Sequence, residues 1–474
     1  MTSFTAPVRV PPAALAAAPA TLRAAGLLTL LLGGLLGNFV FGVSTIALPV
    51  MTADLGMGIG AGSLLVTVFL LGFASSLVLG GRLGDRYGRR RLFRMGALAL
   101  AATSVLVAVS PESLTVLSSR FAQGVAIGLM LPQVLATIQN TAEGRRRAAW
   151  IGLYVAVIGA GTMLGQLITG AVVALPWGAL GWRAAFVVVA LIAGVAAAAA
   201  SAVPETRAAG GGIDVVGAVL LALTVGCLLA ALAVHGSALL TVGLAAGAVV
   251  TGGVLVLWER RMPGDRALLP AVAMREPALV IGLVLNAIFF TGYGAFVYYF
   301  VFAAENGMGL TAMQTAGTLV VFAAAFVAVS VIAPRLHARL PARGLMVAGT
   351  AVQGLTLAGI ALWAAAGWPA PQPLVLQALL CVLGGAQALM YAPLVGTVMN
   401  AVPPAVAGLA SGLFSTVQQV ALALGVAVFS LVYAAADAGG GEGLMVCALV
   451  QAGLAVPMLV IVLVARRALG GRAG

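Results

Sequence analysis

The sequence predicts an all-α membrane protein that crosses the bilayer about fourteen times. Hydrophobic residues make up 62% of the 474-residue chain and charged residues only 8%, and the mean hydropathy is +1.15. Soluble domains carry about 25% charged residues. The apolar residues also form runs of roughly 20 or more, the length that spans about 30 Å of hydrocarbon. The bilayer is therefore the solvent for most of this chain.

The first six predicted helices form an N-terminal bundle over residues 24–203, after a cytoplasmic tail at residues 1–23. The tail is rich in Ala and Pro, and the apolar run after it is longer than the roughly 7 to 15 residues of a signal-peptide core. Charged residues or Pro and Gly end each run. The six expected helices span 24–50, 61–81, 92–110, 113–139, 148–172 and 183–203.

A linker at residues 204–276 contains two extra expected helices, 213–233 and 236–258. A C-terminal six-helix bundle follows at 277–467, with a cytoplasmic tail at 468–474. Its expected helices span 277–303, 311–333, 344–366, 373–399, 406–434 and 443–467. The loops after the second helix of each bundle share an R-L-x-x-R pattern, beginning at Arg82 and Arg335. Parallel six-helix repeats of this kind are a known plan of membrane transporters.

The net charge of +12 is concentrated in short loops on one side of the expected helices. Such an asymmetry follows the positive-inside rule and places both termini in the cytoplasm, with the chain in the plasma (inner) membrane. Arg183 is the main basic residue on the other side. Because the arginines form no contiguous basic surface, we expect no nucleic-acid partner.

Residues 81–91 read GRLGDRYGRRR and resemble the G-x-L-x-D-R-x-G-R-R signature of the major facilitator superfamily. Glycines permit a tight turn between the second and third helices, and a carboxylate among arginines forms charge-assisted pairs. In the family this loop latches the two halves in one conformation, which implies that role for Gly81, Asp85, Arg86, Gly88, Arg89 and Arg90. The alternative is a generic cytoplasmic loop.

Two further segments resemble motifs of the same superfamily. Residues 120–124 read RFAQG, like its R-x-x-Q-G signature, and Arg120 within a membrane helix is expected to face the bundle interior or a watery cavity. The alternative is an arginine that snorkels to the outer surface. Gly161, Gly165 and Gly170 on the fifth helix resemble the glycine-rich antiporter motif. They are expected to form a hinge, with simple helix packing as the alternative.

Nearly the whole chain is similar to the fourteen-helix drug:H+ antiporter family. The likeness lies in residues 47–49 (ALP), residues 181–183 (GWR), Asp214 and residues 407–412 (AGLASG). It implies the major facilitator fold, with two six-helix bundles plus an inserted two-helix hairpin. One departure is Val40, where the family usually has an aspartate.

No acidic residue lies near the middle of an expected helix, so Arg120 is the only charge that we expect to be buried. Intramembrane carboxylates are the usual proton relays of transporters. The nearest candidates here are Asp54, Asp85 and Glu305 at helix ends.

The resemblance implies a substrate cavity lined by the first and fourth helices of each half. Asn286, Phe290 and Tyr293 share one face of the ninth helix, which suits a greasy ligand, unless this stripe faces lipid or another helix. Tyr298 and Tyr299 are expected in the interfacial aromatic belt. The full set of expected cavity residues is Asn38, Gln123, Gln133, Asn286, Phe290, Tyr293, Gln387 and Tyr391.

The resemblance implies a secondary active transporter that exports small amphipathic compounds, drugs or secondary metabolites, by proton antiport with alternating access. The first alternative, motivated by Val40, is a facilitator or symporter of a neutral or anionic metabolite. The second is a non-transporting membrane sensor or scaffold. The chain has no lysine and therefore no nucleotide-binding P-loop. We expect no enzyme, cofactor or metal site, and a monomer whose partners are the lipid bilayer, an amphipathic substrate and protons.

Overall fold

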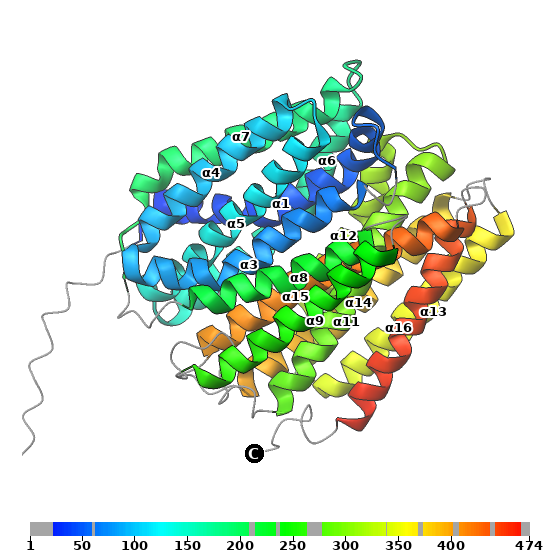
Figure 1. The fold of residues 1–474 in the computed structure, drawn as a ribbon. Coiled ribbons are helices and arrows are strands. Elements are labelled where there is room, and N and C mark those ends of the chain that lie inside the picture. Colours follow the sequence, from blue (N-terminus) through cyan, green and yellow to red (C-terminus); the bar gives the residue numbers. More distant parts are fainter. Residues whose placement is uncertain are drawn as a thin grey trace, which may run out of the picture.

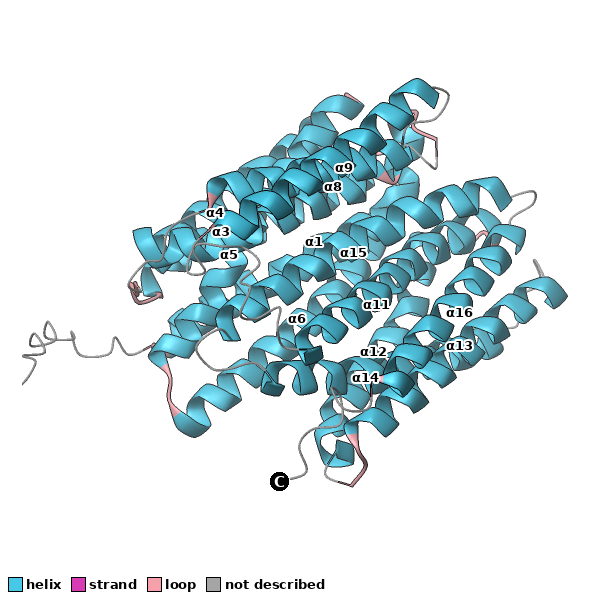
Figure 2. Cartoon of the chain, turned by 60° about the horizontal axis from the view of Figure 1, so that its bottom comes forward, coloured by secondary structure: helices cyan, strands magenta, loops and turns pink. Residues whose placement is uncertain are grey.

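The computed structural model describes residues 22–58, 62–207, 214–233, 238–262, 277–337, 339–367, 373–401, 407–436 and 441–465. Within these ranges every regular element is a helix, as Figure 2 shows. The all-α architecture expected from the apolar runs is confirmed.

Six helices build the N-terminal bundle: α1 (Ala24–Asp54), α3 (Leu64–Tyr87), α4 (Arg89–Val109), α5 (Ser113–Thr141), α6 (Gly144–Val173) and α7 (Leu180–Ala199). The chain turns between α3 and α4 at Gly88, whose φ of 104° lies in the region that favours glycine. In this bundle α1 packs on α6, α3 packs on α5, and α4 packs on both α5 and α7.

The C-terminal bundle comprises α11 (Pro277–Phe302), α12 (Ala312–His337), α13 (Ala342–Gly367), α14 (Pro373–Ala401), α15 (Ala407–Ala436) and α16 (Gly441–Val464). A five-residue π-helix, Ala303–Gly307, extends α11. Here α11 packs on α15, α12 on α14, and α13 on α14 and α16. These four pairings repeat those of the N-terminal bundle in the same order, so the two sets of six helices share one packing arrangement.

The two halves meet along two seams, one between α3 and α15 and the other between α6 and α12. Between the bundles in sequence comes a hairpin of α8 (Val215–Ala233) and α9 (Ala238–Arg261). Helix α8 packs on α3 and on α15, so the hairpin covers the first seam (Figure 1). The outer face of α9 exposes Leu and Val side chains, as expected for a surface in contact with lipid.

Eleven of the described helices are long and apolar enough to cross a membrane, and the bent helix α3 makes a twelfth. Helices α6 and α8 contain shorter apolar stretches, Val157–Val173 and Val215–Leu228. Fourteen crossings therefore stay a prediction, since α6 and α8 must also span.

Candidate functional site

Arg120 lies inside the N-terminal bundle, where its side chain is 0% exposed. Its Nε donates to the carbonyl oxygen of Leu65 on α3 at 2.9 Å, and its two terminal nitrogens donate to Gln123 Oε1 and Ser44 Oγ at 2.6 Å each. The guanidinium also lies 4.4 Å from the ring centroid of Phe69, close enough for a cation–π contact. Oxygen acceptors from three helices and an aromatic face therefore hold this cation.

The network of Arg120 continues into neighbouring helices rather than towards the second half. Gln123 is fully buried and donates from Nε2 to Ser104 Oγ on α4 at 2.8 Å. Ser44 donates to the carbonyl oxygen of Val40 at 2.6 Å. Arg120 and Gln123 thus join α1, α3, α4 and α5, and their observed contacts are those of helix packing.

Two other expected cavity residues of the N-terminal half also bond to backbone. Gln133 is buried and donates to the carbonyl oxygen of Gly80 on α3 at 2.8 Å. Asn38 is half-buried and donates to the carbonyl oxygen of Ile158 on α6 at 3.1 Å. These amides stabilise helix pairs, while Asn38 keeps part of its side chain accessible.

In the C-terminal half, helices α11 and α14 bring aromatic side chains together. The Tyr391 ring stacks on Phe289 with centroids 5.1 Å apart and an interplanar angle of 12°. It meets Phe290 edge-on at 5.1 Å, and Phe414 of α15 lies 6.5 Å away. We call Phe289, Phe290, Tyr391 and Phe414 the aromatic cluster. Because Tyr391 is half-buried, part of the surface of the aromatic cluster is accessible to a ligand.

Two amide oxygens beside the aromatic cluster lack hydrogen-bond partners within the described chain. Asn286 is 0% exposed and donates to the carbonyl oxygen of Phe414 at 2.9 Å, which leaves its Oδ1 unpartnered. Gln387, one turn before Tyr391 on α14, has an unpartnered Oε1. Since buried polar atoms normally have partners, these two oxygens are candidates to accept hydrogen bonds from a ligand.

Tyr293 connects the aromatic cluster to the seam between the halves. Its ring lies 6.0 Å from Phe290 and 6.1 Å from Phe322 of α12, and its side chain is within hydrogen-bonding reach of Thr162 on α6. The three predicted aromatic cavity residues, Phe290, Tyr293 and Tyr391, therefore meet, together with Phe289.

The expected belt positions Tyr298 and Tyr299 are instead buried, at 2% and 0% exposure. Tyr299 donates its hydroxyl to Gln451 Oε1 of α16 at 2.7 Å and lies 6.1 Å from Phe429. The belt expectation was wrong because a position near a helix end does not say which face of the helix packs inward.

In the loop with the superfamily signature, Asp85 accepts hydrogen bonds from Arg89 Nε at 3.1 Å and Nη2 at 2.6 Å. Arg89 is 5% exposed, and its Nη1 donates to the carbonyl oxygen of Ala136 at the end of α5. Arg86 stacks over Tyr87 at 5.4 Å, and Gly81 lies against Pro132 of α5.

A residue that the sequence analysis missed, Glu205, completes this loop. Its Oε1 accepts from the backbone nitrogen of Arg90 at 3.2 Å, and its Oε2 lies 3.6 Å from Arg90 Nε. A carboxylate is favourable at the N-terminal end of a helix such as α4. A Cβ at Gly88 would lie 2.6 Å from Glu205 Oε1, so a side chain there would push the carboxylate away, in addition to the strain of the positive φ.

The three expected hinge glycines lie in two different interfaces. Gly161 and Gly165 let α6 approach the backbone of α1, where a Cβ would meet the carbonyl oxygens of Leu35 and Phe39. A Cβ at Gly170 would instead lie 3.0 Å from the carbonyl oxygen of Ala312, across the seam on α12. Close packing thus explains the first two, and Gly170 alone contacts the other half.

The expectation that Arg120 is the only buried charge was wrong. Arg89, Asp214 and Glu259 are also buried, at 5%, 3% and 8% exposure. Asp214 accepts from Trp258 Nε1 at 2.9 Å and thereby joins the start of α8 to the end of α9. Burial at helix ends is decided by packing between elements, which hydropathy along the chain does not show.

The three candidate proton-binding carboxylates have different surroundings. Asp54 accepts hydrogen bonds from Arg183 Nη2 at 2.9 Å and from Trp182 Nε1 at 3.1 Å. Arg183, the main basic residue on the side opposite the other arginines, is thus paired with an acid. Asp85 is bonded to Arg89. Glu305, in the π-helix after α11, has a buried Oε1 without a hydrogen-bond partner among the described residues.

Comparison of the sequence with known protein families identifies the family of this chain. The family model described as Major Facilitator Superfamily matches residues 30–426, which is most of the chain. The chain belongs to the major facilitator superfamily.

Curated relatives of this facilitator include the "Probable actinorhodin transporter" of Streptomyces coelicolor, which is 30% identical over 82% of this chain and 69% of its own length. The "Tetracenomycin C resistance and export protein" of Streptomyces glaucescens is 28% identical over 83% and 72%. The "Cephamycin export protein CmcT" of Amycolatopsis lactamdurans is 29% identical over 84% and 82%.

Solved structures with the same fold include a peptide transporter POT in complex with sulfate, with a TM-score of 0.70, 16% identity and coverage of 95% of this facilitator and 97% of that chain. A D-xylose-proton symporter aligns with a TM-score of 0.69 and 16% identity over 92% and 96%. At these identities the likeness shows the fold alone.

Proposed function

We propose that this facilitator is a secondary transporter that exports small amphipathic compounds of the secondary-metabolite or drug class. Of the relatives named above, one is a resistance and export protein for tetracenomycin C, one is a cephamycin export protein, and one is a probable actinorhodin transporter. The observation that carries the proposal is the aromatic cluster on α11, α14 and α15 with the unpartnered amide oxygens of Asn286 and Gln387 beside it.

These side chains indicate the chemistry of the substrate. The rings of the cluster lie with centroids 5.1 Å apart, and aromatic faces of this kind stack on the planar rings of a ligand. The amide oxygens accept hydrogen bonds from hydroxyl or N–H groups. The described part of the cluster contains no carboxylate that would attract a cation. We therefore assign a neutral or anionic aromatic compound with hydrogen-bond donors, held by helices α11 and α14.

Proton antiport is the proposed source of energy, with Glu305 as the proton-binding residue. Because its buried Oε1 accepts no hydrogen bond from the described residues, the neutral, protonated form of Glu305 costs less to bury than the carboxylate. The π-helix around Glu305 is a further support, because π-bulges often occur at functional sites. Asp54 and Asp85 are already neutralised by arginines.

Alternating access would arise from movement of the two halves about the α3–α15 and α6–α12 seams. Gly170 and the loop at residues 81–91 would control that movement, and both termini would lie in the cytoplasm. The alternative of a facilitator or symporter is favoured by Val40, which is fully buried and leaves no carboxylate next to Arg120 and Ser44.

The test is uptake of a fluorescent hydroxylated polycyclic aromatic dye into inverted membrane vesicles. We expect Tyr391→Ala to lower the transport rate strongly, because it removes the ring stacked on Phe289. Tyr299→Phe, which alters a buried tyrosine of the α11–α16 contact, is the matched control and should retain most of the rate. Equal rates for both variants and the unaltered protein would contradict the placement of the substrate.

A further inference from the structure

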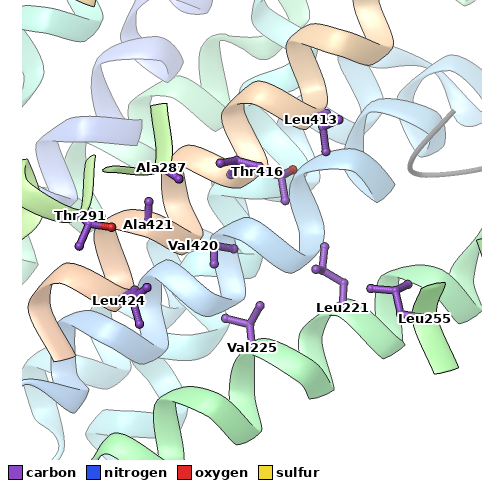
Figure 3. A pocket seen from close by; sticks show the side chains of 11 residues that line it. Leu221, Val225, Leu255, Ala287, Thr291, Leu413, Thr416, Val420, Ala421 and Leu424 are labelled. Carbon is purple, nitrogen blue, oxygen red and sulfur yellow. The ribbon is translucent and has the colours of Figure 1, made fainter. Parts of the chain in front are cut away.

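A cavity lies between the inserted hairpin and the C-terminal bundle, with a volume of about 260 Å³. Its walls come from α8, α9, α11 and α15, and Figure 3 shows Leu221 and Val225 of α8 facing the α15 side chains. Apart from two threonines, the lining side chains are aliphatic. The cavity is distinct from the aromatic cluster, because it adjoins the α11 positions Ala287 and Thr291 instead of Asn286 and Phe290.

The cavity has a defined direction relative to the membrane. Leu221 near the start of α8, Leu255 near the end of α9 and Leu413 near the start of α15 lie at one end (Figure 3). Leu424 and Val225 lie towards the other. The eleven residue steps from Leu413 to Leu424 correspond to about 16 Å of helix at about 1.5 Å per residue. The cavity is therefore a slot that runs from near one membrane surface towards the middle of the bilayer.

One polar atom lies near the surface end of this slot. Thr416 is 4% exposed, and its Oγ1 has no hydrogen-bond partner among the described residues. A helical threonine commonly donates to the backbone carbonyl one turn earlier, as Thr356 does here to Val352 at 2.7 Å. The Thr416 hydroxyl can therefore donate a hydrogen bond to a ligand that has one acceptor at the end of an aliphatic chain.

We propose that this cavity binds one acyl chain of a membrane phospholipid, with the Thr416 hydroxyl donating to the ester carbonyl of that chain. A cavity of about 260 Å³ is smaller than the roughly 300 to 1,000 Å³ of pockets for drug-sized ligands. The outer face of the hairpin is itself exposed to lipid, with Leu239 at 86% and Val249 at 76% exposure. Acyl chains therefore surround the hairpin permanently.

The location gives the bound chain a structural role. Helix α8 contacts α3 of the first half and α15 of the second, and the cavity lies between α8 and α15. An acyl chain in this slot fills the gap between the hairpin and the C-terminal bundle and so adds packing contacts between them. The attachment of the hairpin over the α3–α15 seam therefore depends on bound lipid.

The test uses the purified full chain in liposomes of phosphatidylcholine that carries a photoactivatable diazirine on one acyl chain. After illumination, adducts are mapped by peptide mass spectrometry. We expect adducts on α8 and α15 at the cavity residues from Leu221 to Val225 and from Thr416 to Leu424. Val225→Phe should lower these adducts about tenfold, the effect of excluding two methylene groups. Thr416→Val should lower them about fivefold through loss of one hydrogen bond.

Val249→Phe on the exposed face of α9 is the matched control and should leave the cavity adducts unchanged. Adducts confined to outward faces such as that of Val249 would overturn the proposal, and this result is available from the unaltered protein even if a variant fails to fold. Protection of the cavity residues by the hydroxylated aromatic dye would also overturn it and make the slot a substrate site. Because no transport is measured, the outcome is independent of the proposed function.

Discussion

The replacement Arg120→Lys separates a packing role of this arginine from a role in transport. The guanidinium donates three hydrogen bonds, to Leu65 O, Gln123 Oε1 and Ser44 Oγ, and these acceptors lie on three different helices. An ammonium keeps the charge but lacks the planar fork that reaches these acceptors together. Loss of one charge-assisted bond costs about 1.5 to 3 kcal/mol. We expect Arg120→Lys to destabilise the protein by at least that amount.

The assay is thermal denaturation in detergent, followed by size-exclusion chromatography of a fluorescent fusion. Arg94→Lys, at an exposed position of α4, is the matched control and should change the free energy of unfolding by less than about 0.5 kcal/mol. The buried network predicts that stability and transport fall together. A variant with unaltered thermal stability and no transport would refute this reasoning.

Three further predictions concern the interfaces and the cluster. Gly165→Ala should lower the free energy of unfolding by about 1 to 3 kcal/mol, because the added Cβ would meet the carbonyl oxygen of Phe39. The control is Gly194→Ala, where a Cβ meets nothing within 4 Å, and it should leave the stability unchanged or raise it. Thermal denaturation measures both. Asp85→Asn should change stability by less than about 1 kcal/mol, because the Asp85 end of its pair with the buried Arg89 is 36% exposed and asparagine keeps an oxygen that accepts from Arg89. It should nevertheless lower the dye transport rate; equal rates would remove the latch role. Tyr391→Phe should keep most transport that Tyr391→Ala loses, since stacking needs the ring, and equal loss in both would show that the hydroxyl matters instead.

The helical segments were predictable because each is an apolar run bounded by charges or by Pro and Gly. The first helix was expected to begin at residue 24 and does so, and its end moved from residue 50 to Asp54. Pro49 lies inside the helix, so a proline did not end it. The loop around Gly88 was likewise recognisable, because a positive φ and a tight turn require that residue.

Side-chain partners were less predictable than segments, for a physical reason. Polarity within a membrane helix shows that a residue needs a partner, but not whether that partner is a ligand or another helix. Gln123 and Gln133 bond to neighbouring helices, while Asn286 and Gln387 keep unpartnered oxygens. All four look alike in the sequence. Glu205 was missed because its importance comes from the fold of the linker onto α4.

The central claim, export driven by a proton gradient, is tested most directly by dye transport in proteoliposomes with an imposed pH gradient. We expect accumulation of the dye against its concentration gradient, and loss of this accumulation when the pH gradient is collapsed. Glu305→Gln should abolish the accumulation yet preserve downhill dye flux, because it removes the proposed proton-binding carboxylate but not the aromatic cluster. Equal dye transport with and without the pH gradient would contradict the claim and favour a facilitator.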